Sequence, residues 1–143
     1  MMLNLFASMV LSTANAADPV ARTVQGQPVE LVAPATLLVF WSLDCDRCGA
    51  DIAALEDAGY DLVSVNTDAA NARSQLAPFA RRHGIETPIV SDDSGELRQR
   101  YGVEEGIVLV NHDGDVLARV SGAPNTAVAL LPALPAQVVA LSD

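Results

Sequence analysis

The chain has 143 residues, 50% of them apolar, and carries 8 Lys and Arg against 18 Asp and Glu, a net charge of −10. This length suits one domain with a core that needs no stapling by disulfides or metals. Arg81-Arg82 is the only adjacent basic pair. Because phosphate backbones are bound by clustered Lys and Arg, we expect no nucleic-acid partner.

Residues 1–16 resemble a secretory signal peptide. The apolar segment Leu3–Leu11 is too short to span a bilayer, and residues 14–16, Ala-Asn-Ala, place small side chains where signal peptidase reads. No Lys or Arg precedes the apolar segment, although such leaders usually begin with one. We expect cleavage after Ala16, a single mature domain of residues 17–143 without a membrane span, and export to a bacterial periplasm or the exterior.

Two extended segments follow. Thr23–Leu31 has Gln25-Gly26 at its centre, which predicts a short hairpin. Leu37–Trp41 is a continuous apolar run of strand length, the pattern of a strand covered on both faces.

Cys45 and Cys48 come directly after this buried strand, at the start of a predicted helix that Gly59 ends. A helix N-terminus presents unpaired N–H groups and the positive end of its dipole, both of which favour a thiolate. The spacing therefore predicts a redox-active pair, in which Cys45 is the sulfur that is attacked and Cys48 resolves the mixed disulfide.

Two other interpretations of the pair are open. A zinc site would need two further ligands, and the only histidines, His83 and His112, lack the spacing of such sites. We expect a C-terminal helical turn to hold His83 and an exposed turn to hold His112. A purely structural disulfide would close a loop too short to restrict the unfolded chain strongly. We expect neither a metal nor a cofactor.

The remainder of the chain alternates strands and helices. Leu62–Asn66 predicts a second buried strand, and a right-handed crossover would place it beside Leu37–Trp41 and parallel to it. Pro78 interrupts the next helical pattern, so the helix either kinks there or becomes regular only near Ala77. The other predicted segments are the Asp68–His83 helix, the extended Ile85–Val90, the helix Ser94–Tyr101, the strand Ile107–Val110, the turn Asn111–Gly114, the strand Val116–Val120 and a helical tail, Asn125–Leu141, broken by Pro132 and Pro135.

This order of elements and its motifs resemble the thioredoxin superfamily, in particular exported TlpA/ResA/DsbE-like oxidoreductases, over about residues 23–122. Gln25–Leu31 is similar to the family's opening hairpin, and Phe40–Cys48 to its FWxxWCxxC motif. Tyr101-Gly102-Val103 and Leu109–Gly114 are similar to its YGV and lIDrdG segments. The resemblance implies an α/β fold, a thioredoxin-like three-layer sandwich with a central mixed β-sheet flanked by helices.

The chain departs from this family at three positions. Asp44 replaces the usual Trp before the first cysteine and disfavours a neighbouring thiolate, whereas Arg47 favours one. Val39 stands where thioredoxins often bury an acid. The family's cis-proline loop has no proline here, and Gly106 is the residue expected to supply its unusual backbone angles.

The resemblance implies a thiol:disulfide oxidoreductase that uses Cys45 and Cys48, supported by Trp41, Asp44 and Arg47. Its expected partners are cysteine-containing proteins and a redox partner protein. Two alternatives stay open: a thioredoxin-fold binding or scaffold module with a vestigial dithiol, and a Cu(I) carrier, since thiolates select that ion.

Overall fold

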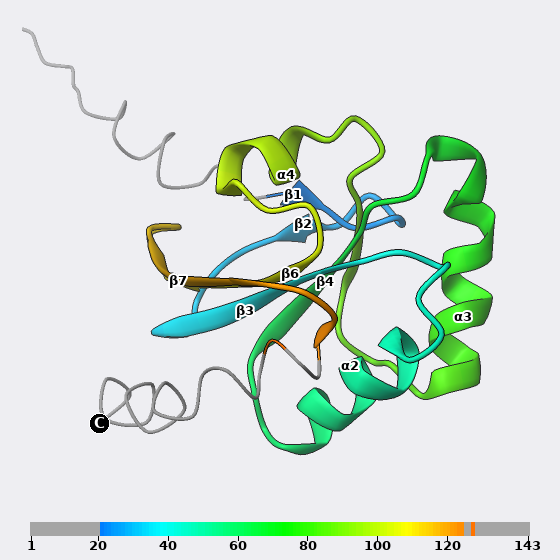
Figure 1. Ribbon diagram of the computed structural model, residues 1–143, viewed down its shortest axis with the longest axis horizontal. Coiled ribbons are helices and arrows are strands. Elements are labelled where there is room, and N and C mark those ends of the chain that lie inside the picture. The colour runs from blue at the N-terminus through cyan, green and yellow to red at the C-terminus, as the bar shows by residue number, and fades with distance from the viewer. Residues whose placement is uncertain (1–20, 125–126, 128–143) are drawn as a thin grey trace, which may run out of the picture.

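The computed structural model describes residues 21–124 and residue 127 (Figure 1). A mixed five-stranded sheet of order β5-β4-β3-β6-β7 forms the centre of this part of the chain. Its strands are β3 (Ala35–Trp41), β4 (Leu62–Asn66), β5 (Ile89–Ser91), β6 (Gly106–Asn111) and β7 (Val116–Ser121). A small antiparallel pair, β1 (Ala21–Arg22) and β2 (Pro28–Val29), precedes them, as the predicted hairpin requires.

Strand β3 is the middle strand, and all seven of its residues are buried. It pairs in parallel with β4, with Leu37 opposite Leu62, and antiparallel with β6, with Leu37 opposite Leu109. A strand that is covered on both faces needs the continuous apolar run seen in the sequence. The prediction that Leu37–Phe40 and Leu62–Val65 are adjacent and parallel is confirmed.

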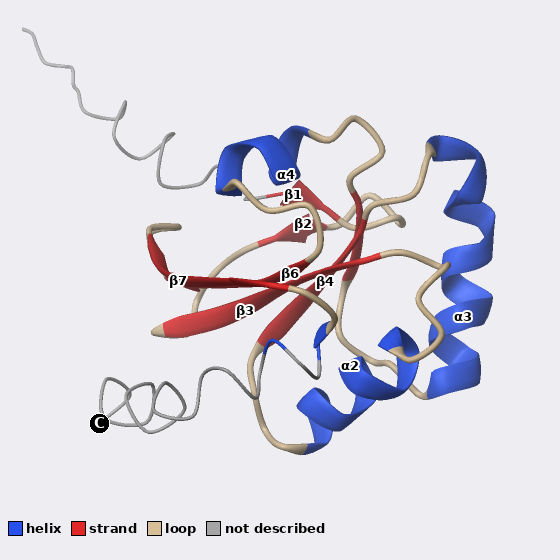
Figure 2. Cartoon of the chain, in the orientation of Figure 1, coloured by secondary structure: helices blue, strands red, loops and turns tan. Residues whose placement is uncertain are grey.

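Helices cover both faces of the sheet (Figure 2). Val39 and Trp41 of β3 point to one face, which is packed by α2 (Cys48–Asp57) and α3 (Leu76–His83). Alternate residues Leu38 and Phe40 point to the other face, toward α4 (Glu96–Tyr101) and β2. This alternation produces the three layers of the predicted α/β sandwich.

The predicted helix over Asp68–His83 is two pieces, the 3-10 helix η2 (Ala70–Gln75) and then α3. Pro78 is the third residue of α3, where the missing N–H would have had no partner within the helix. The regular helix therefore begins at Leu76, close to the predicted position. It ends at Gly84, which has φ of 71° and a left-handed conformation that glycine adopts readily.

Two boundaries differ from the sequence prediction. The extended segment is confined to β5, and α4 begins at Glu96 rather than Ser94. The buried carboxylate of Asp92 explains the later start, because it accepts hydrogen bonds from the backbone N–H groups of Leu97 and Arg98. It thereby satisfies N–H groups that the first helical turn leaves unpaired.

The leader-like residues 1–16 and the helical tail at Asn125–Leu141 lie outside the described residues, apart from Ala127. Among the helices that the structure describes, none has the length and apolar character needed to cross a membrane.

Candidate active site

Cys45 and Cys48 form a disulfide with a Cα–Cα separation of 5.5 Å. Cys45 is partly exposed, whereas Cys48 is fully buried as the first residue of α2. The sequence placed Cys45 at the helix N-terminus itself; the structure places it in the turn before the helix, where its N–H bonds the carbonyl of Ser42. Of the two cysteines, Cys45 is therefore the one that solvent reaches, and Cys48 is shielded.

Trp41 is a buried residue at the end of β3, just before the cysteine turn. Its ring is buried, its indole N–H donates to the Ser64 hydroxyl, and it stacks on Phe79 with ring centroids 4.6 Å apart. Buried aromatic rings with a satisfied polar group contribute large apolar contact areas at fixed geometry. Trp41 therefore fixes the end of β3 immediately before the turn that carries Cys45.

His83 lies against the first turn of the helix that carries Cys48. Its ring packs on Phe79 at 4.5 Å, and a Cβ added to Gly49 would stand 2.6 Å from the imidazole. Because Gly49 has no side chain, it leaves room for the imidazole ring of His83. The sequence correctly predicted that His83 sits in the last turn of α3, but not its contact with the α2 start. His112 lies in an exposed turn, as expected.

Asp68 holds the cysteine turn to the end of β4. Its Oδ2 accepts hydrogen bonds from the Leu43 N–H and from the Asn66 side-chain amide, each at 2.8 Å. Sequence analysis gave Asp68 no such role. The available signal was its place directly after β4, because neighbouring parallel strands end at the same edge of a sheet.

Asp44 and Arg47 flank Cys45 as exposed side chains, and within the described chain neither makes an ion pair. Arg47 occupies the N-cap of α2 without a side-chain capping bond. Charges so exposed are screened by salt, so an effect of either one on Cys45 should weaken as ionic strength rises.

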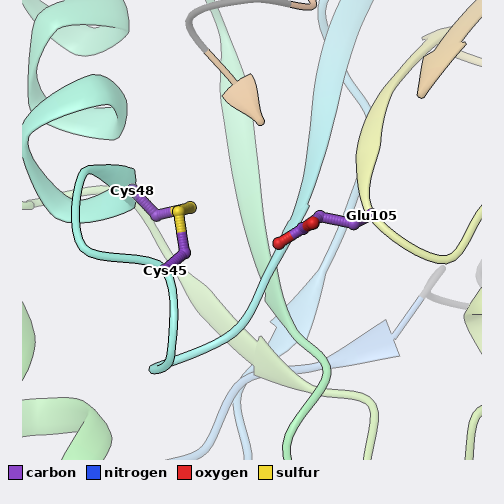
Figure 3. Close-up of side chains that lie close together, drawn as sticks. All are labelled: Cys45, Cys48 and Glu105. Atoms are coloured by element: carbon purple, nitrogen blue, oxygen red, sulfur yellow. A yellow bond between two sulfur atoms is a disulfide. The ribbon is translucent and has the colours of Figure 1, made fainter. Parts of the chain in front are cut away.

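Glu105 faces the disulfide from the loop before β6 (Figure 3). A carboxylate oxygen of Glu105 and the two cysteine sulfurs all lie within 4.8 Å of one another. This residue was absent from the sequence-predicted site. The available signal was the loop just before Gly106, where the resemblance places the family's cis-proline loop.

Gly106 makes this arrangement possible. It has φ of +147°, and a Cβ there would stand 2.2 Å from the carbonyl oxygen of Val120 in β7. The carbonyl of Glu105 also accepts a hydrogen bond from the Gly122 N–H at 2.9 Å. The prediction that Gly106 supplies unusual backbone angles is confirmed, and the described residues contain no cis peptide bond.

Comparison with known proteins gives a consistent result. The family model described as AhpC/TSA family matches residues 14–119. The crystal structure of StoA from Bacillus subtilis is similar at 25% identity and a TM-score of 0.57, over 77% of this chain and 90% of that one. No curated protein matches the sequence.

Two further solved structures share the fold. A secreted Mycobacterium tuberculosis disulfide oxidoreductase, homologous to Escherichia coli DsbE, is 17% identical with a TM-score of 0.61, over 85% of this chain and 98% of that one. A thioredoxin-like protein from Porphyromonas gingivalis is 17% identical with a TM-score of 0.65, over 89% and 92%. The fold is thioredoxin-like, and the cysteine pair lies where the turn after β3 enters α2.

Proposed function

This chain belongs to the AhpC/TSA family, and from that premise we propose that it is a TlpA/ResA/DsbE-like oxidoreductase that exchanges its Cys45–Cys48 disulfide with cysteines of partner proteins. One observation carries the proposal: an accessible sulfur is bonded to a buried one at the start of α2. Family and cysteine pair together support a thiol–disulfide redox function in general. Exchange with partner proteins is the finer statement that we propose.

The exchange proceeds in two substitutions at sulfur. A partner thiolate attacks Cys45 Sγ, a new sulfur–sulfur bond forms, and Cys48 leaves with the electron pair of the broken bond. A second partner thiolate then attacks the partner sulfur of this mixed disulfide and releases Cys45. The partner loses two electrons and gains a disulfide, while the protein becomes a dithiol; the reverse sequence reduces a partner disulfide.

We also place this exchange outside the cytosol. The leader-like residues 1–16 and the likeness to a secreted protein support export to the periplasm or beyond. In an oxidising compartment, the pair either is kept reduced by a second redox protein or acts as an oxidant, and this redox protein is the partner we propose beside the substrates. N-terminal sequencing of protein from an exporting host tests this part: a chain that begins at Ala17 supports it, and one retained from Met1 in the cytosol contradicts it.

Trapping tests the exchange itself. Expressed in an exporting cell, the variant Cys48→Ser should accumulate mixed disulfides with partner proteins, because the thiol that would release them is gone. Cys45→Ser is the matched control and should trap few. The wild-type protein should catalyse insulin reduction by a small dithiol. If the wild-type protein is inactive toward insulin and Cys48→Ser captures no partner proteins, the interpretation as a scaffold with a vestigial dithiol would be favoured.

A further inference from the structure

We propose that the reduced dithiol and Glu105 together form a zinc site, with Cys45 Sγ, Cys48 Sγ and a Glu105 carboxylate oxygen as its three protein ligands. The proposal rests on the closeness of three side chains from two distant parts of the sequence, since Glu105 lies more than 50 residues after Cys48. The turn before α2 and the first residue of that helix supply the two sulfurs, and the loop before β6 aims an acidic side chain at them (Figure 3).

The spacing suits a tetrahedral ion. Zinc–sulfur bonds of about 2.3 Å and zinc–oxygen bonds of about 2.1 Å put neighbouring ligand atoms roughly 3.5–3.8 Å apart. The three candidate atoms already lie within 4.8 Å of one another. Reduction breaks the sulfur–sulfur bond, so each sulfur can then rotate about its own Cα–Cβ bond into that geometry. The fourth position is left to water, as in other zinc sites with three protein ligands.

Both sides of the site are held in place. Cys48 is buried in α2, whose first turn packs against His83. The Glu105 backbone is bonded to Gly122, and Gly106 lies against Val120 of β7. Ligands whose backbone is already fixed lose only side-chain freedom on binding, which favours affinity.

The donor set favours zinc over the alternatives. Two thiolates and a carboxylate are a borderline set that Zn²⁺ accepts, whereas Mg²⁺ and Ca²⁺ require oxygen ligands throughout. Cu(I) is a soft ion that prefers thiolate ligands, so the carboxylate would contribute little to its binding. Two thiolates and Glu105 would also gather three negative charges, and a divalent cation relieves their repulsion.

Binding is linked to the redox state of the pair. A dithiol reductant delivers two electrons and two protons to the disulfide and leaves two thiols at Cys45 and Cys48. Zinc then displaces both protons to the buffer, and no electron passes to the metal. The oxidised pair offers no thiolate. Zinc would therefore stabilise the dithiol form of the protein and block Cys45 from exchange. This inference rests on the proposed function only in requiring that the Cys45–Cys48 disulfide can be reduced.

Competition with a chromophoric zinc chelator tests the site on the full chain, reduced with a phosphine that is then removed. We expect one Zn²⁺ per reduced chain and none per oxidised chain. Glu105→Gln should weaken binding by at least about tenfold, since even residues that only support a ligand alter zinc affinity by that factor. Glu104→Gln is the matched control, because this neighbouring acid lies outside the cluster and pairs with Arg98 at 3.9 Å instead, and it should bind as wild type does.

Co²⁺ serves as the spectroscopic readout. The reduced protein should show a thiolate-to-cobalt charge-transfer band and the intense visible bands of a four-coordinate ion. Loss of the visible intensity in Glu105→Gln, with its thermal unfolding unchanged, supports the carboxylate ligand. Equal zinc affinity of Glu105→Gln and wild type, or no binding by the reduced protein, would overturn the site. Zinc binding by a protein inactive toward insulin would support the site and contradict the exchange function.

Discussion

At the scale of single residues, we expect the difference in exposure between Cys45 and Cys48 to set the relative reactivity of their thiols. Cys45 is partly exposed and Cys48 has 0% exposure. In the reduced, chelator-treated protein, a limiting amount of iodoacetamide near neutral pH should modify Cys45 first, because the reagent reaches it and the helix start favours its thiolate. Peptide mapping by mass spectrometry measures the ratio, and preferential labelling of Cys48 would contradict the assignment of roles.

The charges beside Cys45 should tune the same reaction in opposite directions. Asp44→Ala should speed alkylation of Cys45 and Arg47→Ala should slow it, each by about two- to fivefold, because an exposed charge contributes under about 1 kcal/mol. Both effects should shrink as salt is added. Asp46→Asn is a useful reference for a change in net charge within the same turn, and equal rates in all variants would show that these charges do not act on the thiolate.

Gly106 carries a prediction about stability. Gly106→Ala should lower the free energy of unfolding by at least about 2 kcal/mol, since alanine meets both a strained backbone and the Val120 carbonyl at 2.2 Å. Gly114→Ala separates these costs, because Gly114 has φ of +86° with no atom within 4 Å of the added Cβ. It should cost about 1–2 kcal/mol. Urea denaturation compares the two, and equal losses would mean that the contact with β7 relaxes freely.

At the scale of elements, the cysteine turn depends on its attachment to the end of β4. Asp68→Ala removes the acceptor of the Leu43 N–H and of the Asn66 amide, so we expect a loss of about 1–3 kcal/mol in stability and faster hydrogen exchange at Leu43. Asp93→Ala breaks only an exposed ion pair with Arg73 and should cost under about 1 kcal/mol. Unchanged exchange at Leu43 in Asp68→Ala would show that the turn is held by other contacts.

At the scale of the whole molecule, the fold should survive reduction of its disulfide. The bridge closes a very short loop, while the core is built from β3, β4 and β6 on both faces of the sheet. Loop-closure entropy for so short a loop is about 2 kcal/mol or less, so the midpoint of urea unfolding should fall by no more than roughly 1–2 M on reduction. Far- and near-ultraviolet circular dichroism of the reduced form should remain native, and a collapse of the near-ultraviolet signal would contradict this prediction.

Local patterns in the sequence were enough for most of the architecture. Continuous apolar runs predicted β3 and β4, because strands buried on both faces admit no alternation of polar residues. Glycines predicted the ends of α2 and α3, because left-handed backbone follows from the missing Cβ. The cysteine pair, its place before a helix and the sandwich class all depend on residues near one another in the chain.

The tertiary structure alone decided which distant side chains lie around the cysteine turn. Glu105, in the loop before β6, lies beside the two sulfurs. Asp68, after β4, bonds the turn at Leu43, and His83 of α3 lies against Gly49. Hydrophobic periodicity identifies elements but carries no information about which polar residue at a strand end points to which neighbour. That depends on sheet order, on the antiparallel register of β3 with β6, and on the close approach that Gly106 permits. The sequence by itself thus determined the fold class and the position of the cysteine pair, and the pairing of β3 with β6 brought a carboxylate to that pair.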